Sequence, residues 1–171
     1  MSVSGGRRPS LSPILGGDLL GWRGLPADLP LDELTAVFPR NSDWSGSAQL
    51  GRQHRPATYV WLDLPADDRN LRVWLDDKYV IMLDLTYAGA RHAHELPLLF
   101  DEQPVTLDTW QETVPLAASE LVFVAHGLAA FIDRETDSIW HLAAYTPTTI
   151  AIYLDDLRLD FRTRRLPART S

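Results

Sequence analysis

A faint internal repetition is the feature that most constrains the fold of this chain. Leu31-Asp32-Glu33-Leu34 leads to Phe38-Pro39, and Leu107-Asp108-Thr109-Trp110 leads to Val114-Pro115. Each segment is followed by β-rich runs that an acidic turn divides. A unit that recurs in this way predicts two copies of one helix-plus-hairpin element sharing a core, over residues 28–87 and 95–157. The alternative is chance, because residue types that are common in helices and turns can imitate a repeat.

The pattern of apolar residues predicts the individual elements. Leu31, Leu34, Val37 and Phe38 recur at helical spacing between two prolines, while residues 40–56 form a polar loop. Strand-forming runs follow in two sets of three, which we expect to form two antiparallel meanders: 58–64, 71–75 and 79–87, then 120–126, 128–132 and 138–145. A second helix is expected over residues 107–114. Residues 150–157 favour a helix, with a strand as the competing interpretation because several of these residues are β-branched.

These elements predict an α+β fold, with an antiparallel sheet built from two β-meanders and short helices packed on one face. A chain of 171 residues suits a single domain, which we place at residues 14–161. Residues 1–13 contain mainly Ser, Gly, Pro and Arg and are expected to be disordered. Leu19, Leu20 and Trp22 are expected to hold the next segment on the core. Residues 162–171 form a basic C-terminal tail.

Charge and cysteine content narrow the classes of partner. The formal net charge of −7 argues against nucleic-acid binding and against docking on anionic membranes. The chain contains no cysteine, which excludes disulfides and thiolate-based metal sites. It also shows no apolar run long enough to span a bilayer, so we expect a cytoplasmic protein. Lys78 is the only lysine among 16 basic residues, a bias typical of a bacterial genome rich in G and C.

The helix-then-meander plan, used twice, resembles the tandem repeats of the BamE/SmpA-like and β-lactamase-inhibitor-protein group. The segments that carry the resemblance are residues 31–39 and 107–115, together with the hairpins at Asp76-Asp77 and Asp133 to Asp137. It covers roughly residues 28–157. The resemblance implies a scaffold that binds other proteins across an exposed sheet. This chain departs from the group because it lacks a lipoprotein cysteine and any disulfide, so no functional residue is transferred to it.

Three tryptophans are candidate partner-binding residues. Trp44 lies in the polar loop, and Trp61 and Trp74 are out of phase with the aliphatic residues of their strands. Aromatic side chains exposed on one sheet face would form a recognition surface. The alternative is that this face is also covered, which would make Trp61 and Trp74 core residues, as most tryptophans are.

A metal site is the second candidate. In an extended segment, His92 and His94 would project from one face, and His126 or His141 could supply a third ligand. The alternative is a solvated loop with two surface histidines. The acidic segment Asp133 to Asp137 resembles an oxygen-ligand loop but is more typical of a hairpin turn.

The sequence therefore favours a non-catalytic protein-binding module, such as an immunity or inhibitor protein with a basic partner. An acidic surface would steer association with such a partner. No cofactor is expected. The alternatives are a small metal-dependent enzyme or small-ligand-binding protein that uses His92, His94 and His141, and a homodimeric structural subunit.

Overall fold

The computed structural model describes residues 10–65, 69–109 and 118–159, and within these it leaves the side chains of residues 42–44 undescribed. The described residues form one antiparallel sheet, in which eight strands follow the order β2-β3-β4-β5-β9-β8-β7-β6 and β1 pairs with β5. The strands are β1 (Leu29–Pro30), β2 (Arg40–Leu50), β3 (Arg55–Leu64), β4 (Arg69–Asp76), β5 (Tyr79–Thr86), β6 (Val105–Thr109), β7 (Ala118–Phe123), β8 (Leu128–Asp133) and β9 (Ser138–Tyr145). No described helix is long and apolar enough to cross a membrane.

Both faces of the central strands are buried. In β4, Leu71, Val73 and Leu75 point to one face, and Arg72 and Trp74 point to the other, because successive side chains alternate along a strand. All five residues are buried. The sheet therefore separates two apolar cores instead of presenting one face to water.

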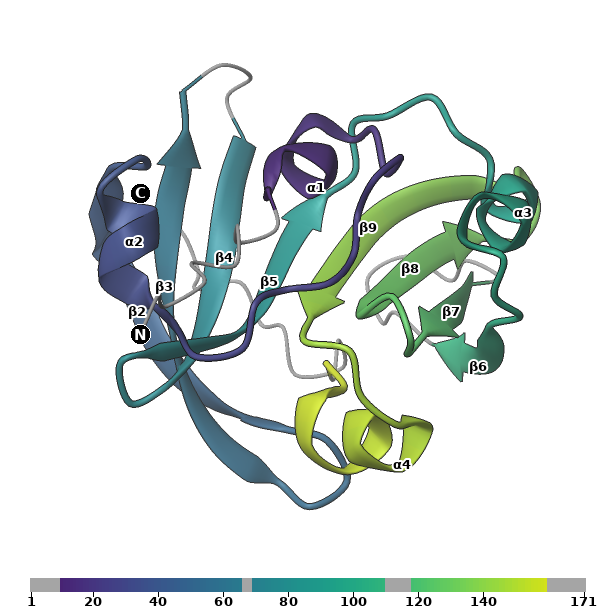
Figure 1. Ribbon diagram of the computed structural model, residues 1–171. Helices are drawn as coiled ribbons and strands as arrows, with labels where there is room; N and C mark the ends of the chain where they lie inside the picture. Colours follow the sequence, from purple (N-terminus) through teal and green to yellow (C-terminus); the bar gives the residue numbers. More distant parts are fainter. Residues whose placement is uncertain (1–9, 66–68, 110–117, 160–171) are drawn as a thin grey trace, which may run out of the picture.

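Three short helices and the N-terminal segment cover the first face (Figure 1). The helices are α1 (Ser12–Gly16), α2 (Leu31–Thr35) and α3 (Leu96–Phe100), and a single 3-10 turn, η1 (Ala93–Glu95), leads into α3. Leu19 and Trp22 are fully buried in this core, as expected, whereas Leu20 is 65% exposed. The prediction that Leu20 packs on the core is therefore wrong.

The second face is covered in part by the last described helical segment. It consists of α4 (Ile150–Ile152) and the π-helical turn η2 (Tyr153–Leu157). Tyr153 and Leu157 pack in the second core with Trp74, Met82 and Phe131. The predicted helix at residues 150–157 is confirmed, but the expectation that all helices pack on one face is wrong.

Arg158 forms hydrogen bonds at both edges of the sheet. Its backbone carbonyl accepts a hydrogen bond of 2.9 Å from Gly51 N, at the tip of the β2–β3 hairpin. Its guanidinium donates to the backbone carbonyl of Asp108 in β6, with Nη2 at 3.0 Å. Because β2 and β6 are the two edges of the strand order, one residue reaches both only if the sheet curls (Figure 1). The curled second face therefore encloses its own core.

Two predicted elements are wrong. Residues 40–50 of the expected polar loop form the edge strand β2. Leu107, Asp108 and Thr109, expected to begin a helix, lie in strand β6, and the rest of that segment lies outside the described residues. Leu31–Thr35 is helical while its counterpart in the second half is a strand, so the two segments differ in secondary structure.

The other predicted strands are present in the structure. The three strands predicted in each half correspond to β3, β4 and β5, and to β7, β8 and β9. The architecture is α+β and dominated by an antiparallel sheet. At the N-terminus, α1 begins at Ser12, inside the segment expected to be disordered. The basic tail lies outside the described residues.

Candidate functional site

An acidic surface is built where the chain entering α2 meets the β4–β5 turn. Leu29 and Pro30 of β1 pair with Val80 and Tyr79 of β5, and Leu31 N donates to Lys78 O at 3.0 Å. This pairing brings together the flanking residues of both segments. We call the group the Tyr79 corner: Asp28, Asp32, Asp76, Asp77, Lys78 and Tyr79.

Local backbone conformation produces the turns on which the corner depends. Asp28 and Asp77 have φ values of 55° and 54°, in the left-handed region that aspartate tolerates better than most residues. Asp77 and Lys78 form the two-residue connection between β4 and β5. The carboxylates are therefore directed to the surface by tight turns, where they stay solvated.

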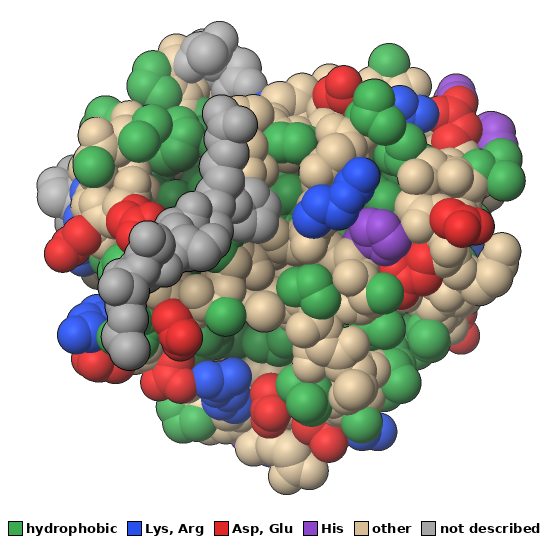
Figure 2. All heavy atoms as spheres, in the orientation of Figure 1, with side chains coloured by type: hydrophobic (Ala, Val, Ile, Leu, Met, Phe, Trp, Pro, Cys, Tyr) green, Lys and Arg blue, Asp and Glu red, His purple; other side chains and the backbone are tan. Residues whose placement is uncertain are grey.

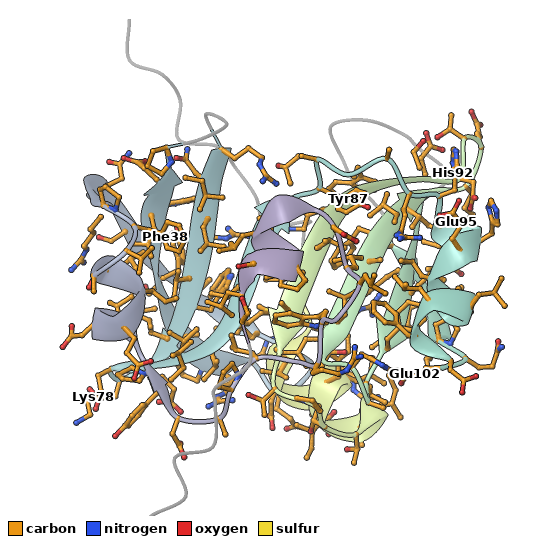
Figure 3. All side chains as sticks on the ribbon, turned by 45° about the horizontal axis from the view of Figure 1, so that its top comes forward. Phe38, Lys78, Tyr87, His92, Glu95 and Glu102 are labelled. Carbon is orange, nitrogen blue, oxygen red and sulfur yellow. The ribbon has the colours of Figure 1, made fainter. Side chains whose placement is uncertain are left out.

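Negative charge dominates the Tyr79 corner. Four carboxylates face two cations, Lys78 and Arg55, and Arg55 Nη2 is 2.6 Å from Asp76 Oδ2. Figure 2 shows acidic side chains gathered on this side of the molecule, and Figure 3 places Lys78 at the same end. Tyr79 is 38% exposed, and Lys78 Nζ lies 5.3 Å from the centroid of its ring. The corner thus presents carboxylates around an aromatic ring that already contacts one cation.

A buried polar cluster occupies the second face of the sheet. Trp61, Arg72 and Asp84 are consecutive cross-strand neighbours on β3, β4 and β5. Asp84 Oδ2 accepts from Arg72 Nε at 2.7 Å and from Trp74 Nε1 at 2.6 Å, while His141 Nε2 lies 3.2 Å from Asp84 Oδ1. The Arg72 guanidinium carbon lies within 5.5 Å of three aromatic ring centroids, those of Tyr59, Trp61 and Trp74. The cluster neutralises its own charge inside the protein.

The structure places the candidate tryptophans differently from one another. Trp74 is 3% exposed, which corresponds to the core interpretation of this residue. Trp61 is half-buried beside Arg72. The backbone of Trp44 lies in β2, and its side chain is outside the described residues. Trp61 and Trp74 therefore lie together on the second face, around Arg72.

A second buried carboxylate, Glu120, lies under the closing segment of the fold. Tyr153 Oη donates to Glu120 Oε1 in a short hydrogen bond, and Arg158 Nε donates to Oε2 at 2.8 Å. Burial raises the pKa of the Glu120 carboxyl, and the Arg158 charge offsets this only in part. Burial and the nearby Glu120 charge also raise the pKa of the Tyr153 hydroxyl. This triad ties η2 to β7.

The candidate metal ligands are not brought together. His92 and His94 stack with their ring centroids 5.8 Å apart, and His92 bridges to Ser138. His141 instead lies 5% exposed beside Asp84 on the second face. Within residues 10–65, 69–109 and 118–159, no group of three or more His, Asp or Glu side chains is arranged to hold a metal ion. Figure 3 shows His92 at the opposite end of the molecule from Lys78.

His94 has an acidic partner, Asp137. Its Nδ1 forms a short contact with Asp137 Oδ2, and the hydrogen bond that it donates to this carboxylate raises the pKa of the His94 imidazole. Burial raises the pKa of the Asp137 carboxyl, but the hydrogen bonds and charge of His94 outweigh it, so the pKa falls below its ordinary value. Asp137, expected in a hairpin turn, thus also anchors the segment that leads into α3.

Sequence reasoning missed the Arg72–Asp84 pair and the Tyr79 corner. The out-of-phase position of Arg72 beside Trp74, and the single carboxylate inside the apolar run of β5, were the signals for the pair. The corner depends on the pairing of β1 with β5, which no local pattern indicates. The chain matches no family model, and no characterised protein or solved structure is significantly similar to it.

Proposed function

We propose that this chain is a non-catalytic protein-binding module, of the immunity or inhibitor kind, that binds a basic partner protein through the Tyr79 corner. The observation that carries the proposal is the exposed ring of Tyr79 among the carboxylates of Asp28, Asp32, Asp76 and Asp77. Carboxylates around an interface steer a basic partner and fix its orientation.

The chemistry of the corner favours arginine or lysine side chains on the partner. The Tyr79 ring is 38% exposed, and its neighbour Lys78 already makes the kind of cation contact that a partner side chain would make. Asp32 and Asp77 are exposed and lie on the two segments that the Leu31–Lys78 hydrogen bond joins. A partner guanidinium could then pair with a carboxylate and stack on the ring at once.

Trp44 and Trp61 remain candidate contacts of the same partner. Trp61 is half-buried in β3, and the backbone of Trp44 lies in β2, the edge strand that pairs with β3. Trp74 is excluded from direct contact in this structure because it is buried and hydrogen-bonded to Asp84. Trp44→Ala and Trp61→Ala therefore belong beside the variants of the corner.

The proposal is tested by affinity capture with matched variants. The tagged protein and the variant Asp32→Asn/Asp77→Asn/Tyr79→Ala are used to capture proteins from the lysate of the source cell, and the captured proteins are identified by mass spectrometry. The control, Asp101→Asn/Glu135→Gln/Leu98→Ala, removes the same charge and an exposed large apolar side chain elsewhere.

We expect one basic protein to bind in stoichiometric amount to the wild type and to the control. The corner variant should lose it, and titration calorimetry with the purified partner should show an affinity that falls as salt rises. Equal binding by all three proteins would overturn the assignment to this corner. Capture of no protein by the wild type would overturn the binding function.

A further inference from the structure

One edge of the sheet is built to accept another strand. β2 pairs with β3 on one side, and no described strand pairs with its other side. After the register shift between Asn41 and Ser45, the pairing with β3 runs without interruption from Ser45 to Leu50. These six residues, Ser-Gly-Ser-Ala-Gln-Leu, include no charged residue and no proline. Charged residues and prolines are what proteins commonly use to protect an exposed edge, and this run has neither.

The register shows which backbone groups face outward. Gln49 is opposite Pro56, which has no N–H and cannot donate to β2. Prolines in sheets occupy positions that do not donate to the ladder, so this is a non-hydrogen-bonded pair. Hydrogen-bonded and non-hydrogen-bonded pairs alternate along an antiparallel ladder. Ser47 and Ser45, two and four residues before Gln49, therefore also form non-hydrogen-bonded pairs with β3. The N–H and C=O groups of all three therefore point away from β3.

The opposite edge of the sheet is protected. β6 is only five residues long and carries Asp108, whose backbone carbonyl accepts from Arg158 Nη2 at 3.0 Å. The Asp108 side chain also accepts from Arg134 Nη2 at 2.6 Å. A strand that paired with β6 would have to displace the Arg158 guanidinium from the Asp108 carbonyl. Arg158 also meets the β2 side, but at Gly51, after the Ser45–Leu50 run has ended. That run is therefore the part of the described sheet edges that another strand can reach.

We propose that β2 pairs with β2 of a second copy of this chain, antiparallel, so that the two sheets become continuous. A two-fold axis near Ser47 places Ser45 opposite Gln49 and Gly46 opposite Ala48, so the run is complementary to itself. Each copy carries a formal charge of −7, and copies therefore repel each other over most of their surface. The uncharged Ser45–Leu50 run allows close approach without bringing like charges together. The inference uses backbone groups of β2 and none of the residues that define the Tyr79 corner, so it does not rest on the proposed function.

Sedimentation equilibrium of the full chain tests the proposal. We expect the weight-average mass to rise from 19.2 kDa toward twice that value as the concentration increases from micromolar to near millimolar. Ser47→Pro removes an outward N–H without breaking the ladder to β3, and it should hold the mass at the monomer value. Ser47→Ala keeps the N–H and should dimerise like the wild type. Far-UV circular dichroism establishes that each variant is folded.

A second pair of variants keeps the test decisive if Ser47→Pro does not fold. Ser47→Lys leaves the backbone intact but brings two ammonium groups together near the two-fold axis, which should prevent dimerisation. Thr106→Lys places the same charge on β6 and should leave the dimer unchanged. A wild type that stays monomeric throughout would overturn the proposal. So would a dimer that survives Ser47→Pro or Ser47→Lys.

Discussion

Arg72 and Asp84 form an ion pair across β4 and β5 inside the protein, with Nε 2.7 Å from Oδ2 and side chains only 9% and 2% exposed. Burying either charge alone is strongly unfavourable, so each residue makes the other tolerable. Trp74 Nε1 donates to the same carboxylate oxygen, and Trp61, Trp74 and Tyr59 surround the guanidinium. Because the two charges compensate each other, they can be buried beside the apolar core on the second face of the sheet.

Breaking this pair from one side should destabilise the fold strongly. Asp84→Ala leaves the Arg72 guanidinium buried without its counter-ion. Arg72→Met leaves the Asp84 carboxylate buried without the arginine that pairs with it. We expect each variant to lose about 3–5 kcal/mol of unfolding free energy. Urea denaturation followed by tryptophan fluorescence measures the loss.

Two comparisons isolate the charge from the packing. The double variant Arg72→Met/Asp84→Leu should recover much of the loss, because no uncompensated charge remains. Arg55→Ala breaks the exposed pair with Asp76 and should lower stability by less than about 1 kcal/mol. If Asp84→Ala were as mild as Arg55→Ala, the pair would contribute little to the fold.

Glu120 should make stability fall as pH rises. Its pKa is raised in the folded protein above the ordinary value of 4.5, chiefly by burial. The folded state therefore holds the proton more tightly than the unfolded chain does. The stability from this difference is fully present below the unfolded pKa and is lost as pH rises through the folded pKa.

Glu120→Gln isolates this contribution because glutamine does not titrate and can still accept from Tyr153. The unfolding free energy of the wild type minus that of Glu120→Gln should decrease from about pH 4.5 upward and then level off. Chemical denaturation at a series of pH values gives the difference. An increase of this difference with pH would mean that Arg158 outweighs burial at this site.

Gly51 should not tolerate a side chain. Its φ is 67°, and a Cβ there would lie 2.0 Å from the Asp155 carbonyl oxygen, where the β2–β3 hairpin meets η2. We expect Gly51→Ala to lower the unfolding free energy by at least about 2 kcal/mol. Thermal unfolding measured by calorimetry would show the change.

Gly16→Ala is the matched control for Gly51→Ala. Gly16 ends α1, and a Cβ there meets no atom within 4 Å. Alanine should raise stability by about 0.5–1 kcal/mol because it restricts the unfolded chain. Similar losses for both variants would show that the contact with Asp155 is not the cause.

The His94–Asp137 pair should be visible in a titration. The pKa of His94 is raised above 6.5 by its hydrogen bond to Asp137, so the imidazolium form persists to higher pH. Its contribution to stability is present below the unfolded pKa and is lost as pH rises through the folded pKa. In an NMR titration of the imidazole resonances, Asp137→Asn should lower the pKa of His94. An unchanged midpoint would show that the two side chains do not interact in solution.

The strand runs, their acidic turns and the helices near residues 31 and 150 were all predictable, because hydrophobic periodicity and turn residues are local signals. For the same reason, the alternation in β4 correctly placed Arg72 and Trp74 on the face opposite Leu71, Val73 and Leu75. The polar composition of residues 40–50 did not indicate strand β2, and the likeness of residues 107–114 to the helix at residue 31 was misleading at β6. A polar segment can become a strand when it pairs with the unpaired N–H and C=O groups of a neighbouring sheet edge. The strand that carries this edge is formed by other segments of the chain.

Local patterns of residues therefore specify which segments extend, which segments turn and which side of each strand is apolar. The tertiary structure alone decided the partners: Asp84 for Arg72, Glu120 for Arg158, and the segment at Asp32 for the turn at Asp77. These pairings depend on strand register and on the curl of the sheet, which bring together the charges of Arg72 and Asp84, 12 residues apart, and of Glu120 and Arg158, 38 residues apart. A local pattern carries no information about such distances, because the free energy that selects them arises only when the whole sheet has formed.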